Sequence, residues 1–328
     1  MPLARVFCKS LREKSVQKRF NLIAGSVVAL GMVTGTAAAQ DPESCKLVRF
    51  SDVGWTDITA TTALTTSVLQ GLGYETDVKV LSVPVTYASL KAKDIDVFLG
   101  NWMPTMEADI APYRDDKSVE TVRTNLEGAK YTLAVPKYTH DAGLKTFADI
   151  AKFKDQLEGK IYGIEPGNDG NRLILEMIEK GSFELKDFEV VESSEQGMLA
   201  QVQRAVDRKE PIVFLGWEPH PMNANIEMAY LEGGDEVFGP NLGGATVATN
   251  VRQGYVEECP NVGKLLQNLE FSLQMENEVM GSILNDSMDP AAAAKAWLEA
   301  NPETLDGWLE GVTTIDGKPG AEAVNATL

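Results

Sequence analysis

The chain has 328 residues and a formal net charge of −18, and 44% of its residues are hydrophobic. This length exceeds a typical single domain, so we expect two domains. The acidic balance argues against binding to nucleic acid or to anionic membranes, because like charges repel.

Residues 1–39 have the composition of a secretory signal. Basic residues come first, an apolar stretch follows over 22–33, and three alanines precede Gln40. This order predicts export to the periplasm and cleavage near Ala39. Without this segment, which carries six Lys/Arg residues and one acidic residue, the formal charge becomes −23. No later stretch approaches the roughly 18 apolar residues that a membrane-spanning helix needs.

Three cysteines are present, and Cys8 lies in the predicted signal. In an oxidising compartment the other two, Cys45 and Cys259, are expected to form a disulfide, with two free thiols as the alternative. The disulfide would hold the two ends of the mature chain in one lobe.

Short apolar strands alternate with helical patterns, which predicts an α/β fold with mainly parallel sheets. The expected strands are 47–50, 76–81, 95–99, 131–135, 161–164 and 212–215, and clear helical stretches cover 59–70 and 198–208. After Pro260 the strand pattern ends. Apolar residues then recur at helical spacing as far as Leu309, which predicts a helical tail packed on one lobe.

Three of the five tryptophans follow expected strands directly. Trp102 and Trp217 each come after an apolar strand and a glycine, and Trp55 follows the strand 47–50. Ligands of parallel sheets bind beyond the carboxyl ends of the strands, so we expect these indoles to face a ligand. Ordinary core packing is the alternative for any one of them, and it is the expected role of the other two tryptophans.

Several converging indoles are suited to a quaternary ammonium ion, which has no N–H to donate and is recognised through its diffuse charge and its methyl surface. Cation–π contacts contribute roughly 1–2 kcal/mol per ring, so four rings would provide most of the roughly 8 kcal/mol of a micromolar affinity. Tyr131, which opens the strand 131–135, is the expected fourth ring.

At these residues the sequence resembles the periplasmic glycine betaine/choline-binding proteins of ABC importers, and among them the choline receptors most closely. The segments that carry the resemblance are 54–57, 98–102, Tyr131, 163–168, 216–222 and 243–247. The resemblance implies a two-lobed periplasmic binding protein fold of type II, each lobe a mainly parallel sheet flanked by helices. Residues 40–127 plus 240–328 would form lobe 1 and residues 128–239 lobe 2. The implied two-segment hinge lies near Gly128 and near Gly243-Gly244.

The resemblance further implies an aromatic box with two rings from each lobe and two polar side chains at one end. The expected ligand-binding residues are Trp55, Asp57, Trp102, Tyr131, Asn168 and Trp217. Such a split site is complete only when the lobes close, and the closed form would deliver choline to the membrane permease.

Asp57 and Asn168, the two polar residues of the expected site, could each have a structural role instead of a ligand-binding one. The Asp57 carboxylate would attract choline and repel the carboxylate of glycine betaine, but aspartate also suits a helix N-cap. Asn168 is at a position where amides commonly serve as turn or cap residues. Arg172 lies four residues further on. If Arg172 points into the box and Asp57 points away, the preference inverts toward glycine betaine or another zwitterion.

An enzyme, such as a choline-ester hydrolase, is the rival class. The chain has no Gly-x-Ser-x-Gly, His-Glu-x-x-His or phosphate-loop motif and no Cys/His cluster, so we expect no catalytic residue, metal or cofactor. Catalysis would depend on His140 or His220, and His220 is expected as a structural residue behind the box. A sensor that docks on a chemoreceptor is a third possibility. We expect a monomer, since no coiled-coil pattern is present.

Overall fold

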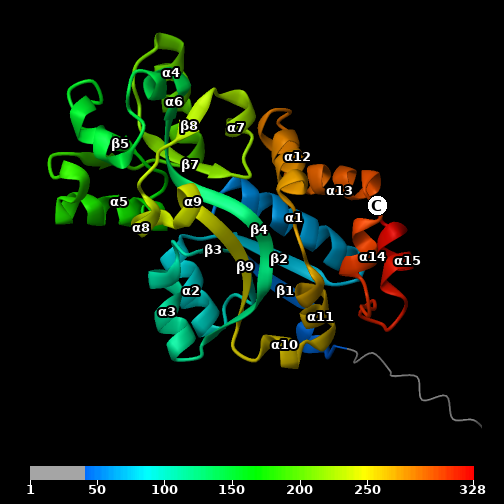
Figure 1. Ribbon diagram of the computed structural model, residues 1–328. Coiled ribbons are helices and arrows are strands. Elements are labelled where there is room, and N and C mark those ends of the chain that lie inside the picture. The colour runs from blue at the N-terminus through cyan, green and yellow to red at the C-terminus, as the bar shows by residue number, and fades with distance from the viewer. Residues whose placement is uncertain (1–40) are drawn as a thin grey trace, which may run out of the picture. The chain divides into compact units, whose positions relative to one another are not determined.

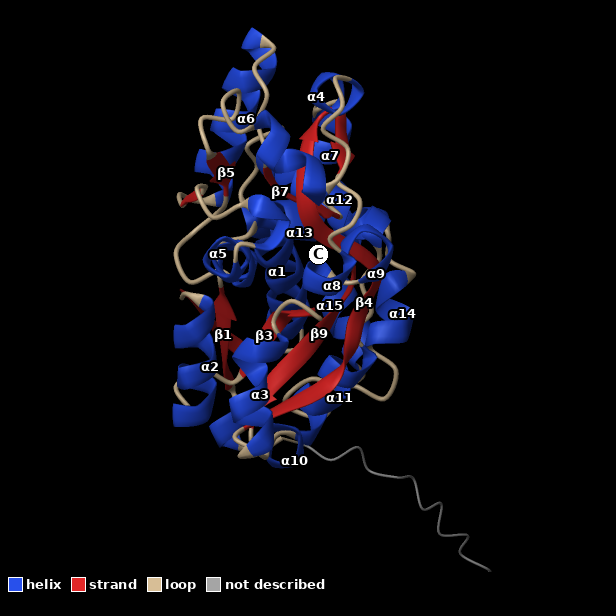
Figure 2. Ribbon diagram, turned by 60° about the vertical axis from the view of Figure 1, so that its left-hand side comes forward, coloured by secondary structure: helices blue, strands red, loops and turns tan. Residues whose placement is uncertain are grey.

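The computed structural model describes residues 41–328, so the predicted signal lies outside the described residues. The strands are β1 Leu47–Asp52, β2 Glu75–Val80, β3 Val97–Met103, β4 Val119–Pro136, β5 Lys160–Tyr162, β6 Glu189–Val191, β7 Phe214–Glu218, β8 Met228–Tyr230 and β9 Gly244–Arg252. They form one sheet in the order β2-β1-β3-β9-β4-β7-β5-β6, with β8 also paired to β4. Helices lie on both sides of these strands (Figure 2). This α/β architecture agrees with the alternation read from the sequence.

The helices fall between the strands and after them. They are α1 Thr56–Gly71, α2 Val83–Ala92, α3 Glu107–Asp115, α4 Lys137–Asp141, α5 Asp169–Lys180, α6 Glu195–Arg208, α7 Met222–Asn225, α8 Asp235–Phe238, α9 Pro240–Gly243, α10 Tyr255–Glu258, α11 Pro260–Asn268, α12 Leu273–Leu284, α13 Pro290–Ala300, α14 Thr304–Trp308 and α15 Gly320–Asn325. Within residues 41–328, no helix has both the length and the apolar character needed to cross a membrane.

Strand pairing is mixed, whereas the sequence predicted mainly parallel sheets. β1 pairs in parallel with β2 and β3, and β5 with β6 and β7. β9 is antiparallel to β3 and β4, and β4 is antiparallel to β7 and β8. The mixture arises because the chain passes through the middle of the sheet twice in opposite directions, along β4 and β9, which lie side by side (Figure 1).

β4 changes partner along its length, and the change falls near Gly128. Residues up to Lys130 pair with β9, and residues from Lys130 onward pair with β7. The β4–β9 register shifts between Leu126 and Ala129, and Gly128 has a positive φ of 78°. Gly243, beside this crossing, has a φ of 70°, and a Cβ there would lie 2.1 Å from the Tyr131 carbonyl oxygen. Both glycines therefore have backbone conformations that other residues rarely adopt, while the hinge and the lobe boundaries stay predictions.

The C-terminal helices pack together with the start of the described chain. α12, α13 and α15 pack against α1 (Figure 1). Cys45 and Cys259 form the expected disulfide, with their Cα atoms 5.7 Å apart. Of the two tryptophans expected in the core, Trp308 is buried, but Trp297 is only partly buried and donates its indole N–H to Glu278 at 2.7 Å. The helical tail therefore supports α1, whose first turn reaches the site described next.

Candidate ligand-binding site

One pocket brings together all six residues predicted to bind the ligand. Seven of the described residues line it: Trp55, Asp57, Trp102, Tyr131, Ile164, Asn168 and Trp217. The space between them is about 240 Å³, counting the open solvent at its mouth. The pocket therefore suits a small molecule.

The lining residues come from segments spread over the whole sheet. Trp55 is the N-cap residue of α1 and Asp57 lies in its first turn. Trp102 comes from β3, where the pairing with β9 shifts register between Phe98 and Asn101. Such a bulge re-aims the side chains that follow it. Tyr131 and Trp217 are direct cross-strand partners on β4 and β7.

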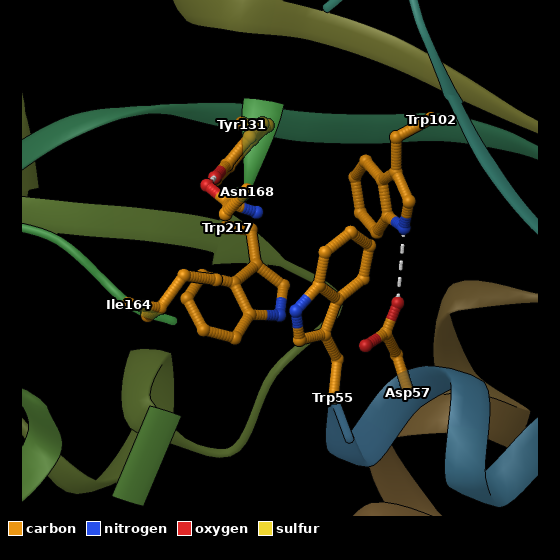
Figure 3. A pocket seen from close by; sticks show the side chains of 7 residues that line it. All are labelled: Trp55, Asp57, Trp102, Tyr131, Ile164, Asn168 and Trp217. Carbon is orange, nitrogen blue, oxygen red and sulfur yellow. Dashed lines mark hydrogen bonds between the residues drawn. The ribbon is translucent and has the colours of Figure 1, made fainter. Parts of the chain in front are cut away.

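The aromatic rings converge on the pocket (Figure 3). The Tyr131 ring centroid lies 6.0 Å from that of Trp102 and 6.2 Å from that of Trp217, with interplanar angles of 58° and 83°. The four rings are each at most 5% exposed. Box tryptophans expected to project from strand ends are therefore covered by each other and by the surrounding chain. Their arrangement presents aromatic faces, rather than polar groups, to whatever enters.

Asp57 is buried beside the rings and is incompletely paired. Its Oδ2 accepts the indole N–H of Trp102 at 3.0 Å (Figure 3). Its Oδ1 has no hydrogen-bond partner among the described residues. Burial, followed by repulsion from Glu195, raises the pKa of Asp57 to about 8. Because Trp55 occupies the N-cap position of α1, Asp57 is not the cap residue that the alternative interpretation required.

Asn168 combines the capping role with a place in the pocket. Its Oδ1 accepts the backbone N–H of Asn171 at 3.0 Å as the N-cap of α5, and also the hydroxyl of Tyr131 at 2.9 Å. Its Nδ2 donates to Asp169 at 3.2 Å. The amide thus fixes the Tyr131 ring against the start of α5.

Carboxyl groups offset the positive ends of the two helices that begin at the pocket. Asp57 lies in the first turn of α1 and Asp169 in the first turn of α5, where acidic residues compensate the helix dipole. Burial raises the pKa of Asp169 to about 6. Helix N-termini are natural sites for anions, so this arrangement disfavours a ligand carboxylate there.

Two further carboxyl groups, those of the half-buried Glu165 and the buried Glu276, were not predicted from the sequence. Glu165 Oε1 accepts the indole N–H of Trp55 at 2.8 Å, and burial raises the pKa of Glu165 to about 7. Glu276 on α12 is 2% exposed, and burial followed by repulsion from Asp57 raises its pKa well above the usual value. Glu165 lies inside the segment 163–168 noted above, which was the available signal. Nothing in the helical pattern around Glu276 distinguished it.

Arg172 and His220 lie outside the pocket lining. Arg172 donates to the Thr105 carbonyl oxygen and to Asp109, both at 2.8 Å, and forms an ion pair with Glu176. It therefore points away from the box. The His220 ring packs edge-on against Trp217 with centroids 4.8 Å apart, and its nitrogens contact Met222 and Glu195. His220 thus lies behind Trp217, and its structural role stays a prediction.

Residues 46–300 match the family described as the substrate-binding domain of the ABC-type glycine betaine transport system. The chain belongs to this family. The match spans most of the chain and includes every residue of the pocket. Members of this family are solute-binding components of transport systems, in agreement with the resemblance found in the sequence.

Solved structures extend the comparison. An ABC-transporter choline-binding protein in complex with choline is 73% identical, with a TM-score of 0.86. An ABC-transporter choline-binding protein in an unliganded semi-closed conformation is 74% identical, with a TM-score of 0.80. Each similarity covers 87% of this chain and 99% of the other.

A more distant structure is lactococcal OpuAC in its closed-liganded conformation, complexed with glycine betaine. It is 25% identical, with a TM-score of 0.73, over 80% of this chain and 98% of the other. Together these similarities confirm the two-lobed type II fold. This chain lies nearer to the liganded choline-binding structure than to the unliganded one, in agreement with its buried box.

Proposed function

We propose that this chain is the choline-binding receptor of an ABC importer. The observation that carries the proposal is the chemistry of the pocket, which has four aromatic rings, one carboxyl group with a free oxygen and no basic side chain among its seven lining residues. Aromatic faces attract a quaternary ammonium ion, and the free Asp57 oxygen can accept a hydrogen bond from a ligand hydroxyl. The choline complex of the 73% identical protein supports this assignment.

Glycine betaine is the alternative ligand, because the description of the family names glycine betaine as the transported compound. Its carboxylate would need a cation or free N–H groups. Arg172, the cation considered from the sequence, is held by Asp109 and Glu176. The acidic first turns of α1 and α5 would repel the carboxylate once their side chains are ionised, which takes a pH above about 6 for Asp169 and above about 8 for Asp57. The described surroundings of the pocket therefore favour choline.

Receptor action would follow from closure of the two predicted lobes, residues 40–127 plus 240–328 and residues 128–239. Trp55, Asp57 and Trp102 belong to the first, and Tyr131, Asn168 and Trp217 to the second. Rotation near Gly128 and Gly243-Gly244 would open and close the box, and the closed form would dock on the permease. In this account the protein acts in the periplasm after cleavage near Ala39.

Catalysis is not part of the proposal. The two histidines that a hydrolase would need do not line the pocket. His220 is buried between Trp217, Met222 and Glu195, and His140 lies on α4. Neither histidine is therefore placed to activate water on a bound choline ester. Turnover of acetylcholine by the purified protein would overturn this part of the account.

Calorimetric titration with choline and with glycine betaine tests the proposal. For residues 40–328 we expect micromolar choline binding and weaker glycine betaine binding at about pH 9, where Asp57, whose pKa is raised to about 8, is mostly ionised and meets the ligand carboxylate with like charge. Asp57→Asn keeps the size of the side chain and removes its charge. It should therefore weaken choline binding and reduce the difference between the choline and glycine betaine affinities. Tighter binding of glycine betaine by the unmodified protein would refute the assignment of choline.

A further inference from the structure

Glu195 is a buried acidic residue that does not line the pocket but contacts both sides of it. It opens α6 and is 1% exposed. Its Oε2 accepts the backbone N–H of Thr56 at 2.8 Å, and its Oε1 accepts the Thr56 hydroxyl at 2.6 Å. Oε1 also lies 3.1 Å from His220 Nε2. Because His220 Nδ1 accepts the backbone N–H of Met222 at 2.9 Å, the neutral ring carries its proton on Nε2 and donates it to Glu195.

Glu195 is not needed to complete its own helix. Ser194 is the N-cap of α6 and accepts the backbone N–H of Gly197 at 3.1 Å. At α1, by contrast, the N-cap residue Trp55 makes no side-chain capping bond. Glu195, which is 139 residues further along the chain than Thr56, supplies an acceptor that the first turn of α1 otherwise lacks.

The two residues that Glu195 contacts, Thr56 and His220, lie next to the aromatic residues of the pocket. Thr56 lies between Trp55 and Asp57 on the first predicted lobe. The His220 ring packs against Trp217 on the second, 4.8 Å between centroids. One carboxyl group therefore ties the loop bearing Trp55 and Asp57 to the loop bearing Trp217. Burying it is costly unless its hydrogen bonds are made, so its contacts favour the closed arrangement.

We propose that Glu195 is a positioning residue for ligand binding, whose hydrogen bonds to Thr56 and His220 form when the lobes close and keep the box shut without touching the ligand. This inference rests on the proposed function. A contact that exists only in the closed form slows escape of the ligand and leaves the encounter of ligand and open protein unchanged.

Glu195→Gln is the central variant. It keeps the shape of the side chain but removes the charge and turns one acceptor oxygen into an N–H donor, which then faces either the His220 Nε2–H or the backbone N–H of Thr56. Loss of hydrogen bonds to a charged group predicts a choline Kd about 10- to 100-fold higher. The increase should lie in the dissociation rate, with the association rate within about twofold of the unmodified protein.

Stopped-flow tryptophan fluorescence on residues 40–328 measures both rates. Thr56→Val removes the hydroxyl and should raise the dissociation rate, as Glu195→Gln does. Thr56→Ser keeps the hydroxyl, so its dissociation rate should equal that of the unmodified protein. In a double-mutant cycle Thr56→Val should add little to Glu195→Gln, since both remove the same contact. Asp207→Asn, on an exposed part of the same helix, is the matched control.

Urea unfolding without ligand separates positioning from simple stability. We expect Glu195→Gln and Thr56→Val to unfold close to the unmodified protein, because the open form lacks the contact. An unchanged dissociation rate, additive effects in the cycle, or a loss of ligand-free stability as large as the loss of affinity would overturn the inference. Absence of choline binding by the unmodified protein would instead refute the proposed function.

Discussion

Choline affinity should fall as the solution is acidified, because Asp57 must lose its proton when the cation binds. Burial raises the pKa of Asp57 to about 8 in the closed pocket, so a large share of the protein carries this proton at neutral pH. Choline has a permanent charge and does not titrate in this range. Proton and cation therefore compete for one carboxyl group, and affinity rises with pH.

The size of the effect follows from the attraction between the two charges. At about 5 Å and an effective dielectric constant of about 20, a unit charge stabilises the carboxylate by about 3 kcal/mol, which lowers its pKa by about 2 units. The bound pKa is then about 6. For the closed form, linkage between a pKa of about 8 in the empty pocket and about 6 in the occupied pocket makes Kd about 50-fold higher at about pH 6 than at about pH 9. Opening of the free protein solvates Asp57 and makes this ratio smaller.

Titration calorimetry across this range measures the Kd. Repeating it near pH 7 in buffers with different ionisation enthalpies counts the protons released, which should approach one. Asp57→Asn should bind more weakly at about pH 9 and lose most of the pH dependence. A small remainder below about pH 7 is expected from Glu165, whose pKa burial raises to about 7, and the further change Glu165→Gln should remove it. A Kd that is constant from about pH 6 to about pH 9, or one whose pH dependence survives in Asp57→Asn, would refute the reasoning.

Other variants test separate parts of the structure. Trp217→Leu should raise the choline Kd by about 5- to 30-fold through loss of one cation–π contact, measured by calorimetry; an unchanged Kd would remove this ring from the box. Replacing Cys45 and Cys259 by serine, which opens a link with a sequence separation of 214, should lower the free energy of unfolding by about 4–5 kcal/mol and leave the Kd within about twofold; a large change in Kd would contradict it. Since the pKa of Glu276 is raised in the folded state, the folded protein loses stability as pH rises above the usual glutamate value. Glu276→Gln should therefore be more stable than the unmodified protein in urea, by a margin that grows upward from about pH 5; a margin that shrinks would be inconsistent. Arg172→Gln should leave the ratio of choline to glycine betaine affinity unchanged, unlike a residue that receives a ligand carboxylate.

The sequence predicted the parts of the fold that local patterns determine. The strand expected at 47–50 is β1, and the helix expected at 59–70 is α1, extended by three residues at its start. β9 and the first part of β4 were not predicted. Buried polar residues such as Thr249 and Asn250 interrupt the apolar pattern of β9, and their environment depends on strands that are distant in the sequence.

The site residues, too, were predictable only where a local sequence pattern marked them. The box tryptophans could be found because each comes soon after an apolar run and a glycine in the sequence. The predicted position was wrong in one respect: Trp102 and Trp217 lie within β3 and β7, because strand pairing continues past the glycine, rather than beyond the strand ends. Glu165, Glu195 and Glu276 could not be found in this way. They are acidic residues in ordinary surface-like contexts, and only folding brings them from three separate parts of the chain to the surroundings of the box. Their importance comes from burial, which a local pattern does not record.

The most direct test of the account compares choline with its neutral carbon isostere, in which a tert-butyl group replaces the trimethylammonium group. The two ligands have the same shape and hydroxyl, so the difference in their calorimetric affinities isolates the positive charge. Four aromatic rings and the Asp57 carboxyl group predict that the isostere binds at least about 100-fold more weakly. Equal affinities would contradict recognition of choline by cation–π contacts.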